Sequence, residues 1–557
     1  MFILLFYVIL AFTSYRVARF LYRGYRCRST IRSLKNQNIP IASHSILFGH
    51  LHIFAEFKRQ HPPDVNIYVF HTWLVQNFTK FFPGETRPPP VVYLDLWPVQ
   101  GIYTLVYDAS AAAQFTQVES LPKYSALTQY LIPLTSNNDI LSTDGDEWKT
   151  WRTRFNPSFS SRNITALLPD LIEEVMVFVD GLKQAAGPQR KWGDVIQLEK
   201  KTTNLSFDII ARATINMRLH EQSRDEPSPL QHAFYEQMQA MGQMTNPVGR
   251  LLLKLSPWHR ARVSRNNRII QDALEPQILK RLNLEQDESN ISRAQTLVDV
   301  ALAPTTNTKE NTELPQFPGD SFVNTLISNL KSFVFAGHDT MASTICFMVK
   351  CLEDNPVCLV KLRKEHDDVL GNNVHSAARM LENSPYILNS LPYTLAVIKE
   401  TLRIYPLAST MRQGRRDFFL TVPGSSVQYP TNDVGLWLSV HGLHTSLDYW
   451  PEPSRFLPER WLVEAGHPLR PVQDAWVPFS AGPRHCIGME LALTQLKLVS
   501  VFTARMFDIE QAWDDWDKQC GKKATPSHVV NGERLYPVGQ GAVHPKDGMP
   551  VHVRLRV

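Results

Sequence analysis

A cysteine in a glycine-bracketed loop is the feature that most restricts what this chain can fold into. Cys486 lies in the segment Phe479-Ser-Ala-Gly-Pro-Arg-His-Cys-Ile-Gly488, and the helical pattern Met489-Glu-Leu-Ala-Leu-Thr-Gln-Leu follows it directly. The start of such a helix places amide dipoles beside the sulfur, which stabilises a thiolate. The glycines let the backbone approach a flat cofactor, and Arg484 can pair with an anionic group on it. A lone cysteine is ordinarily a small buried apolar residue, but packing alone does not explain these neighbours. The loop therefore predicts a cofactor site.

The composition describes a folded protein without a nucleic-acid-binding surface. Of 557 residues, 43% are hydrophobic and 20% are charged, which suffices for a large core and is unlike a disordered chain. The net charge of +5 arises within residues 1–35, which hold seven basic residues and no acidic one. The remaining chain is slightly acidic, so a nucleic-acid partner is not expected. The six cysteines include no Cys-x-x-Cys pair, which disfavours a disulfide framework and a structural zinc site.

The first 22 residues are apolar, and we expect them to attach the chain to a membrane. No charge precedes Arg16, and a helix through Tyr22, with Arg16 and Arg19 reaching toward the interface, is long enough to span. The basic residues follow the apolar run, which argues against a cleaved signal peptide and predicts a body on the cytosolic side. A helix lying on the membrane surface is the alternative. Residues 23–50 are basic and turn-rich, and are interpreted as a linker to a body at 51–557.

The periodicity of the body indicates many helices and few strands. Strands are predicted within residues 91–107 and 551–557, where apolar and polar residues alternate. The polar, proline-containing stretch from Glu285 to Asp320 is typical of a surface loop. Helical patterns cover residues 145–216, 228–285, 321–352 and 391–404. Because the strands do not alternate regularly with helices, a mainly helical α+β fold is expected.

The cysteine loop is one of five motifs that occur between residues 145 and 488. The other four are Gly145-Asp-Glu-Trp-Lys-Thr-Trp-Arg152, Ala336-Gly-His-Asp-Thr340, Glu400-Thr-Leu-Arg403 and Pro458-Glu-Arg-Trp461. In this order they resemble the motifs of the cytochrome P-450 family of haem-thiolate monooxygenases. The resemblance covers about residues 36–557. It implies a mainly α (α+β) fold, with one catalytic domain built on a long central helix and small β-sheets, after an N-terminal anchor.

The resemblance implies that the cofactor is haem b and that Cys486 is the axial thiolate ligand of its iron. Arg412 is implied as a further haem contact, and Arg415 and Arg416 are alternatives for the same role. A dianionic haem demands cationic side chains around it. The other residues that the resemblance places at the haem are Trp148, Arg152, Ala336, Gly337, Phe479, Gly482, Arg484 and Gly488. Two departures from the common family pattern, Gln495 and His338, do not threaten the resemblance.

A carboxylate and a hydroxyl are adjacent in the motif Ala336-Gly-His-Asp-Thr340. Asp339 and Thr340 lie in a strongly apolar run, where a carboxylate is hard to explain as part of a solvated face. Such a pair can relay protons, and the resemblance implies that it delivers the protons for cleavage of the O–O bond of dioxygen. The structural alternative for Thr340 is a hydrogen bond to the Ala336 carbonyl. Gly337 costs a helix ~1 kcal/mol, and the absent side chain is expected to make room for a ligand.

The remaining motif pair has a structural interpretation. Glu400 and Arg403 share one helix face, and exposed pairs of this kind stabilise little. The resemblance instead implies a buried network with Arg460 that holds the cysteine loop.

The function implied by the resemblance is insertion of one oxygen atom from dioxygen into a lipophilic small molecule. No Gly-x-Gly-x-x-Gly fingerprint occurs in the chain, so a separate NADPH-dependent flavoprotein reductase is expected to supply the electrons. The region around Trp461 and Trp476, the C-terminal part and residues 90–160 look most like fungal biosynthetic members. We therefore expect a polyketide or terpenoid substrate and an endoplasmic reticulum location, with the catalytic domain facing the cytosol.

Two alternatives remain from the sequence. One keeps the fold but changes the reaction to that of a haem-thiolate isomerase, dehydratase or peroxide-using enzyme, against which Asp339 and Thr340 argue. The other is a non-catalytic haem-binding membrane protein. Consumption of NADPH in the presence of a reductase distinguishes the monooxygenase from both.

Overall fold

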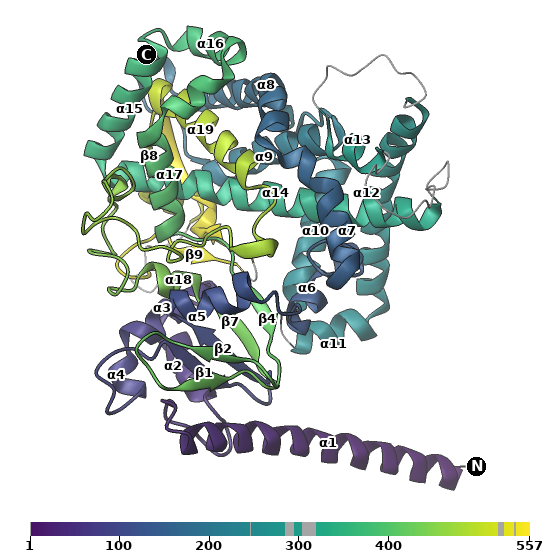
Figure 1. The fold of residues 1–557 in the computed structure, drawn as a ribbon. Coiled ribbons are helices and arrows are strands. Elements are labelled where there is room, and N and C mark those ends of the chain that lie inside the picture. Colours follow the sequence, from purple (N-terminus) through teal and green to yellow (C-terminus); the bar gives the residue numbers. More distant parts are fainter. Residues whose placement is uncertain are drawn as a thin grey trace, which may run out of the picture.

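The computed structural model describes residues 2–245, 247–284, 295–303, 319–521, 529–539 and 542–556 (Figure 1). Helices dominate this part of the chain, and short 3-10 turns link several of them. The helices are α1 (Phe2–Asn36), α2 (Leu51–Gln60), α3 (Ile67–Gln76), α4 (Phe78–Phe81), α5 (Ala109–Ala113), α6 (Ser125–Thr135), α7 (Gly145–Phe155), α8 (Ser161–Ala185), α9 (Leu198–Ile215), α10 (Pro229–Gln243), α11 (Pro247–Leu255), α12 (Pro257–Leu284), α13 (Leu297–Leu302), α14 (Asp320–Asp354), α15 (Pro356–Leu370), α16 (Ala377–Asn383), α17 (Pro392–Ile404), α18 (Val440–His444), α19 (Met489–Met506) and α20 (Trp513–Gln519).

The strands form small sheets at the edges of the helical body. The largest has the order β1-β2-β7-β4, in which β2 and β7 are parallel and the other neighbours are antiparallel. A second sheet has the order β3-β11-β8, and β5 with β6 and β9 with β10 form two-stranded pairs. The strands are β1 (Val91–Asp95), β2 (Ile102–Val106), β3 (Ile196–Gln197), β4 (Met411–Gln413), β5 (Phe419–Thr421), β6 (Gln428–Pro430), β7 (Gly435–Leu438), β8 (Phe507–Gln511), β9 (Pro537–Val538), β10 (His544–Pro545) and β11 (Pro550–Leu555).

The 35-residue helix α14 is the central element (Figure 1). It packs against α9 along its length and also contacts α6, α12, α15, α17 and α19. Its apolar side chains, among them Leu326, Leu330 and Ile345, belong to the main hydrophobic core. Burial on nearly all sides agrees with the apolar composition of its sequence, which a one-sided amphipathic helix would not show. A mainly helical fold with a long central helix and small sheets was expected, and it is confirmed.

The N-terminal helix α1 lies along one side of the molecule, below the β1-β2-β7-β4 sheet in Figure 1. Its residues 2–23 are exposed, and burial begins at Gly24, which lies against Trp97. One turn further, the Arg28 guanidinium pairs with buried Asp95 and lies 5.4 Å from the Trp97 ring. The helix is apolar and long enough to cross a membrane, by length and composition. It continues without a break to Asn36, so residues 23–36 of the predicted linker are helical and held on the body.

Most sequence-based predictions of secondary structure agree with the elements. The strands expected within residues 91–107 are β1 and β2, and the C-terminal strand is β11. The predicted loop at 285–320 lies largely outside the described residues. Its described part contains the six-residue helix α13, which the pattern did not predict. A capping box between Thr296 and Asp299 starts this helix, and a segment so short gives no detectable periodicity.

Candidate functional site

A cavity of about 380 Å³ lies beside the middle of α14 and is closed on one side by the cysteine loop. Its walls come from α6, α7, α9, α14, β4 and the start of α19. Apolar side chains make most of the surface, including Leu127, Leu131, Phe159, Ile209, Ile210, Phe333, Phe335 and Leu491. Charged and reactive groups stand among the polar side chains, as at sites that bind and orient a small molecule. They include Lys123, Arg152, Thr340, Arg412, Arg484 and Cys486.

The thiol of Cys486 faces this cavity, through which it is accessible. The backbone N–H of Cys486 donates to the Phe479 carbonyl at 2.8 Å, which closes the loop, and α19 begins at Met489. Burial raises the pKa of the Cys486 thiol above its ordinary value of 9.0, whereas the Gly488 amide and the Arg152 guanidinium act in the opposite direction. Such a thiol ionises fully when a metal cation binds it. The geometry therefore provides one sulfur ligand that faces an apolar space.

Cationic side chains surround the same cavity. Arg484 pairs with Asp144 at 2.6 Å, donates to the Thr143 carbonyl at 2.9 Å and lies 3.7 Å from the centre of the Trp148 ring. Arg152, one turn after Trp148 on α7, donates to the His485 carbonyl at 3.0 Å. The predicted residues Trp148, Arg152 and Arg484 are thus brought together from segments more than 300 positions apart in the chain.

Arg412 is buried on β4, and its Nε has no hydrogen-bond partner among the described residues. Burial and the nearby charge of Arg484 lower the pKa of Arg412 to about 10. The sequence left Arg415 as a competitor, but Arg415 is exposed and pairs with Glu119 and Asp417. Arg412 rather than Arg415 lines the cavity.

Lys123 is a cavity residue that the sequence did not reveal. It lies in the turn before α6 and forms an isolated β-bridge with Arg412. Burial, Arg412 and Arg484 lower the pKa of Lys123 to about 7. Its signal was absent from the sequence because the bridge joins residues from distant segments, and a lysine in a turn is ordinarily a surface residue.

The residues present fit a haem. The cavity gathers one lysine and three arginine side chains, and in the described structure Asp144 is the one carboxylate paired directly with any of them. The charges of these side chains depress one another's pKa values, which a dianionic ligand would relieve. A Cβ added at Gly488 would meet only Phe159 at 3.9 Å and the Cys486 sulfur at 4.0 Å, so the space beyond it is open to the cavity. One thiol, several cations and an apolar space match an iron porphyrin with two propionates.

The structure gives Asp339 and Thr340 different surroundings. Thr340 lines the cavity, and its hydroxyl donates to the Ala336 carbonyl at 2.8 Å, as its structural alternative predicted. Asp339 is buried but does not line the cavity. One of its oxygens lies 3.5 Å from His544 Nε2, and the other, Oδ2, has no hydrogen-bond partner among the described residues. His544 is a second residue that sequence analysis missed.

The two glycines of the site have separate roles. Gly337 lines the cavity, but a Cβ there would lie 2.7 Å from Ile210 Cδ1, so the missing side chain also admits Ile210 of α9. Gly482 does not line the cavity. It has a φ of +71°, and a Cβ there would lie 2.3 Å from the Thr116 carbonyl oxygen, so this glycine is needed for the turn itself. Ala336 and Phe479, also predicted at the cofactor, line the cavity.

The expected network behind the cysteine loop is present and fully buried. Glu400 accepts hydrogen bonds from Arg403 at 2.8 and 3.0 Å and from Arg460 at 3.0 Å. Arg403 donates to the His444 carbonyl at 3.0 Å, and His444 Nε2 accepts from the Val477 amide, also at 3.0 Å. Val477 lies two residues before the loop segment, so the network fixes the point at which the chain enters the loop.

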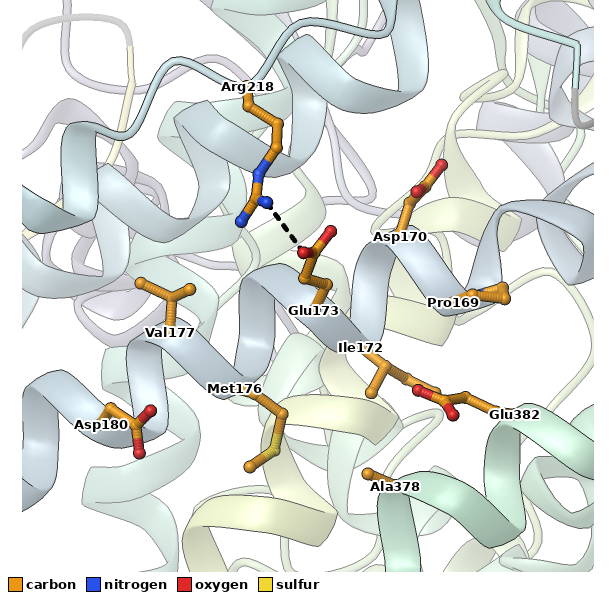
Figure 2. Close-up of a pocket in the computed structure, with 10 residues that line it drawn as sticks. All are labelled: Pro169, Asp170, Ile172, Glu173, Met176, Val177, Asp180, Arg218, Ala378 and Glu382. Atoms are coloured by element: carbon orange, nitrogen blue, oxygen red, sulfur yellow. Dashed lines mark hydrogen bonds and ion pairs between the residues drawn. The ribbon is translucent and has the colours of Figure 1, made fainter.

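A second hollow, of about 570 Å³, lies at the surface over α8 (Figure 2). Carboxylates of Asp170, Glu173, Asp180 and Glu382 surround it, and Arg218 donates to Glu173 at 2.8 Å. It shares no lining residue with the Cys486 cavity and is not part of this site.

Comparison with known proteins agrees with this geometry. The family model described as "Cytochrome P450" matches residues 65–532. Cytochrome P450 monooxygenase polC of Polytolypa hystricis is 33% identical over 543 residues, which cover 97% of this chain and 93% of that protein. Cytochrome P450 monooxygenase acrF of Aspergillus aculeatus is 29% identical over 83% of this chain and 93% of its own. The crystal structure of the cytochrome P450DA heme domain has the same fold, with a TM-score of 0.70, 17% identity and coverage of 93% of this chain and 97% of that one. The chain therefore belongs to the cytochrome P450 family and is a haem-binding monooxygenase.

Proposed function

We propose that Cys486 supplies the axial thiolate to the haem iron. The observation that carries this assignment is that its thiol faces an apolar cavity ringed by basic side chains. Cys346 is the contrasting case. It is fully buried in α14, contacts the Thr202 hydroxyl at 3.6 Å and does not line the cavity. The haem, when bound, supplies the activation of dioxygen, which no side chain of the protein provides.

The other residues of the site bind and orient the cofactor. Lys123, Arg152, Arg412 and Arg484 are the groups that would hold the two propionates, because they are the lysine and arginine side chains on the cavity wall. Trp148 would keep Arg484 in place through its ring. Charged donors held by packing and by bonds to the backbone fix the cofactor without further ordering.

Asp339 and Thr340 are the groups that would hold and transfer protons. The Thr340 hydroxyl donates its own hydrogen to the Ala336 carbonyl, so its oxygen is free to accept a hydrogen bond from the cavity side. Asp339 supplies a carboxylate one position earlier, which lies outside the cavity and faces His544. Proton transfer from it therefore needs a rotation of its side chain or an intervening water.

The substrate proposed for this cavity is a lipophilic polyketide or terpenoid. The wall formed by α6, α9 and α14 is apolar and aromatic, which suits a hydrocarbon-rich molecule. The fungal monooxygenases among its relatives support a biosynthetic role. Members of the family generally receive electrons from a redox partner, and the partner proposed here is an NADPH-dependent flavoprotein reductase.

Attachment to the cytosolic face of the endoplasmic reticulum is the proposed location. The exposed apolar residues 2–15 of α1, followed by the basic segment, support an anchor with the body in the cytosol. The amphipathic helix α11 and the first turn of α12 add exposed apolar side chains, among them Leu251, Leu255 and Trp258. Both features suit a body that rests on a lipid surface.

The carbon-monoxide difference spectrum of the reduced, detergent-solubilised protein tests the ligand assignment. A strongly red-shifted Soret band is expected for the wild-type protein and for Cys346→Ser, the matched control at a buried cysteine. Cys486→Ser is expected to lose the band because a serine hydroxyl does not ionise as a thiol does. Retention of the band in Cys486→Ser, or absence of haem from a well-folded wild-type protein, would overturn the proposal.

A further inference from the structure

We infer that His544 and Glu199 act as positioning residues for the reaction, forming with Asp339 a relay that brings protons from solvent to this buried acid. The inference rests on the proposed role of Asp339. It adds two residues from outside the five sequence motifs, one at the start of α9 and one on β10 near the C-terminus.

The three side chains form a continuous line between α14, α9 and β10. His544 Nε2 lies 3.5 Å from Asp339 Oδ1, and His544 Nδ1 lies 2.7 Å from Glu199 Oε1. Glu199 is also within hydrogen-bonding distance, 3.4 Å, of the Ser343 hydroxyl on α14. The Glu199 contact fixes the orientation of the imidazole ring, which leaves Nε2 directed at Asp339.

Exposure falls along this line from the histidine to the acid. The His544 side chain is 31% exposed, whereas that of Asp339 is 6% exposed. Water therefore reaches the imidazole ring but hardly reaches the carboxylate. A proton that enters from solvent can meet His544 before it meets Asp339.

The surrounding charges keep His544 protonated at neutral pH. Burial opposes the charged form, but the carboxylates of Asp339 and Glu199 outweigh it and raise the pKa of His544 from 6.5 to about 9. The other titratable groups nearby are neutral. Burial lowers the pKa of His338 and outweighs the opposing effect of Asp339. Burial, followed by the charge of Glu199, raises the pKa of the Cys346 thiol. The imidazolium thus lies between two carboxylates with no competing cation recorded among the described residues around it.

The proposed step moves one proton and changes no covalent bond between heavy atoms. The Nε2–H bond of the imidazolium breaks as the proton bonds to Asp339 Oδ1, which gives a neutral acid and a neutral imidazole that still donates Nδ1–H to Glu199. Solvent then returns a proton to Nε2. The 3.5 Å separation must shorten for the transfer, as is common for catalytic contacts before substrate binds.

The pH dependence of stability tests the charged state without any turnover. A folded-state pKa above the unfolded value means that the ion pairs stabilise the protein fully below pH 6.5 and lose this effect as pH rises through about 9. The wild-type holoenzyme is expected to lose melting temperature over this range. His544→Gln should lose less, and the control His552→Gln, which removes a histidine paired with Asp515, should follow the wild type. Equal slopes for His544→Gln and the wild type would overturn the inference.

The second measurement determines how much of the reduced oxygen is released as hydrogen peroxide. The holoenzyme is supplied with NADPH and a flavoprotein reductase without added substrate, and the fraction of oxygen recovered as hydrogen peroxide is measured from pH 6 to 10. The wild type is expected to release more peroxide as pH passes about 9, because His544 then lacks its proton. His544→Gln should release several-fold more than wild type at pH 7 and show no such rise. A flat wild-type profile, or a wild-type profile in His544→Gln, would overturn the relay.

Two further variants separate this inference from the function on which it rests. Glu199→Gln keeps the imidazole but removes one carboxylate, so the rise in peroxide should shift to lower pH even if His544→Gln folds poorly. Asp339→Asn tests the acid itself. If Asp339→Asn releases no extra peroxide, the proposed role of Asp339 is wrong and the relay falls with it. If Asp339→Asn does so but His544→Gln and Glu199→Gln do not, the relay alone is wrong.

Discussion

Thr340 has a hydroxyl that lines the cavity while it donates its hydrogen to the Ala336 carbonyl. Removing it should affect catalysis far more than stability, because a hydrogen bond from threonine to its own helix contributes little net stabilisation. Thr340→Ala is expected to retain haem and melting temperature. Its yield of oxygenated product per NADPH should fall on the order of a hundredfold, with peroxide in its place.

The measurement compares product, peroxide and NADPH for a substrate found by screening with a reductase. Thr340→Ser is the matched control, since it keeps a hydroxyl at the same position and should remain largely coupled. Full coupling in Thr340→Ala would show that another group, such as a bound water, transfers the proton in its place.

Some residues of the site could be predicted from a local sequence motif, and others could not. Cys486, Arg484 and Trp148 stand in compact motifs, and the structure brings all of them to the cavity wall. Lys123 and His544 carry no such pattern, because each acquires its role from a partner more than 200 positions away in the chain. A single sequence does not encode such pairings in any short window.

At the level of elements, Gly337 and Ile210 determine how closely α14 and α9 approach. A Cβ on residue 337 would lie 2.7 Å from Ile210 Cδ1. Gly337→Ala should therefore destabilise the protein by about 1–3 kcal/mol despite the better helix propensity of alanine. In an Ile210→Ala background the contacts with Cδ1 and Cγ1 disappear, and only Cβ of residue 210 remains near, at 3.3 Å, so the same substitution should stabilise by up to ~1 kcal/mol.

Thermal unfolding of the four proteins in this cycle gives the coupling directly. Ile210→Ala alone is expected to cost about 2–5 kcal/mol, so each background needs its own reference. The critical result is a change in the sign of the Gly337→Ala effect on the free energy of unfolding between the two backgrounds. If Gly337→Ala has the same effect in both backgrounds, contact with Ile210 is not the reason for a glycine at this position.

The elements themselves were predictable where hydrophobic periodicity is long. Helix α14 and strands β1 and β2 lie where the pattern placed them, because each has many residues facing a core. The packing reason for Gly337 was not predictable, since Ile210 lies more than 120 positions earlier in the chain. The sequence showed that a glycine inside this helix requires an explanation. The close approach of α9 explains it, in addition to the space needed by the cavity.

At the scale of the whole molecule, α1 combines an exposed segment with one held on the body. Residues 2–23 are exposed, whereas Gly24 and Arg28 contact Trp97 and Asp95. Removing residues 2–22 is therefore expected to leave the fold, the haem content and the carbon-monoxide spectrum unchanged, because the removed side chains are exposed. The truncation does remove the contact between the Phe20 and Trp97 rings, whose centres lie 4.7 Å apart, but Gly24 and Arg28 still hold the helix on the body. Replacing Arg28 with alanine should instead destabilise the body, since it leaves the buried Asp95 carboxylate without its guanidinium partner.

The truncated protein also tests whether the body itself contacts lipid. Without residues 2–22 it should still sediment in part with phosphatidylcholine–phosphatidylserine vesicles, because Leu251, Leu255 and Trp258 remain exposed on and after α11. Changing these three residues and the exposed Val248 and Leu252 of α11 to serine in the truncated protein should abolish the remaining binding without altering the haem spectrum. Vesicle binding that survives all these changes would mean that another surface faces the membrane. Complete loss on truncation alone would mean that α1 is sufficient for attachment and that the exposed residues of α11 have another role.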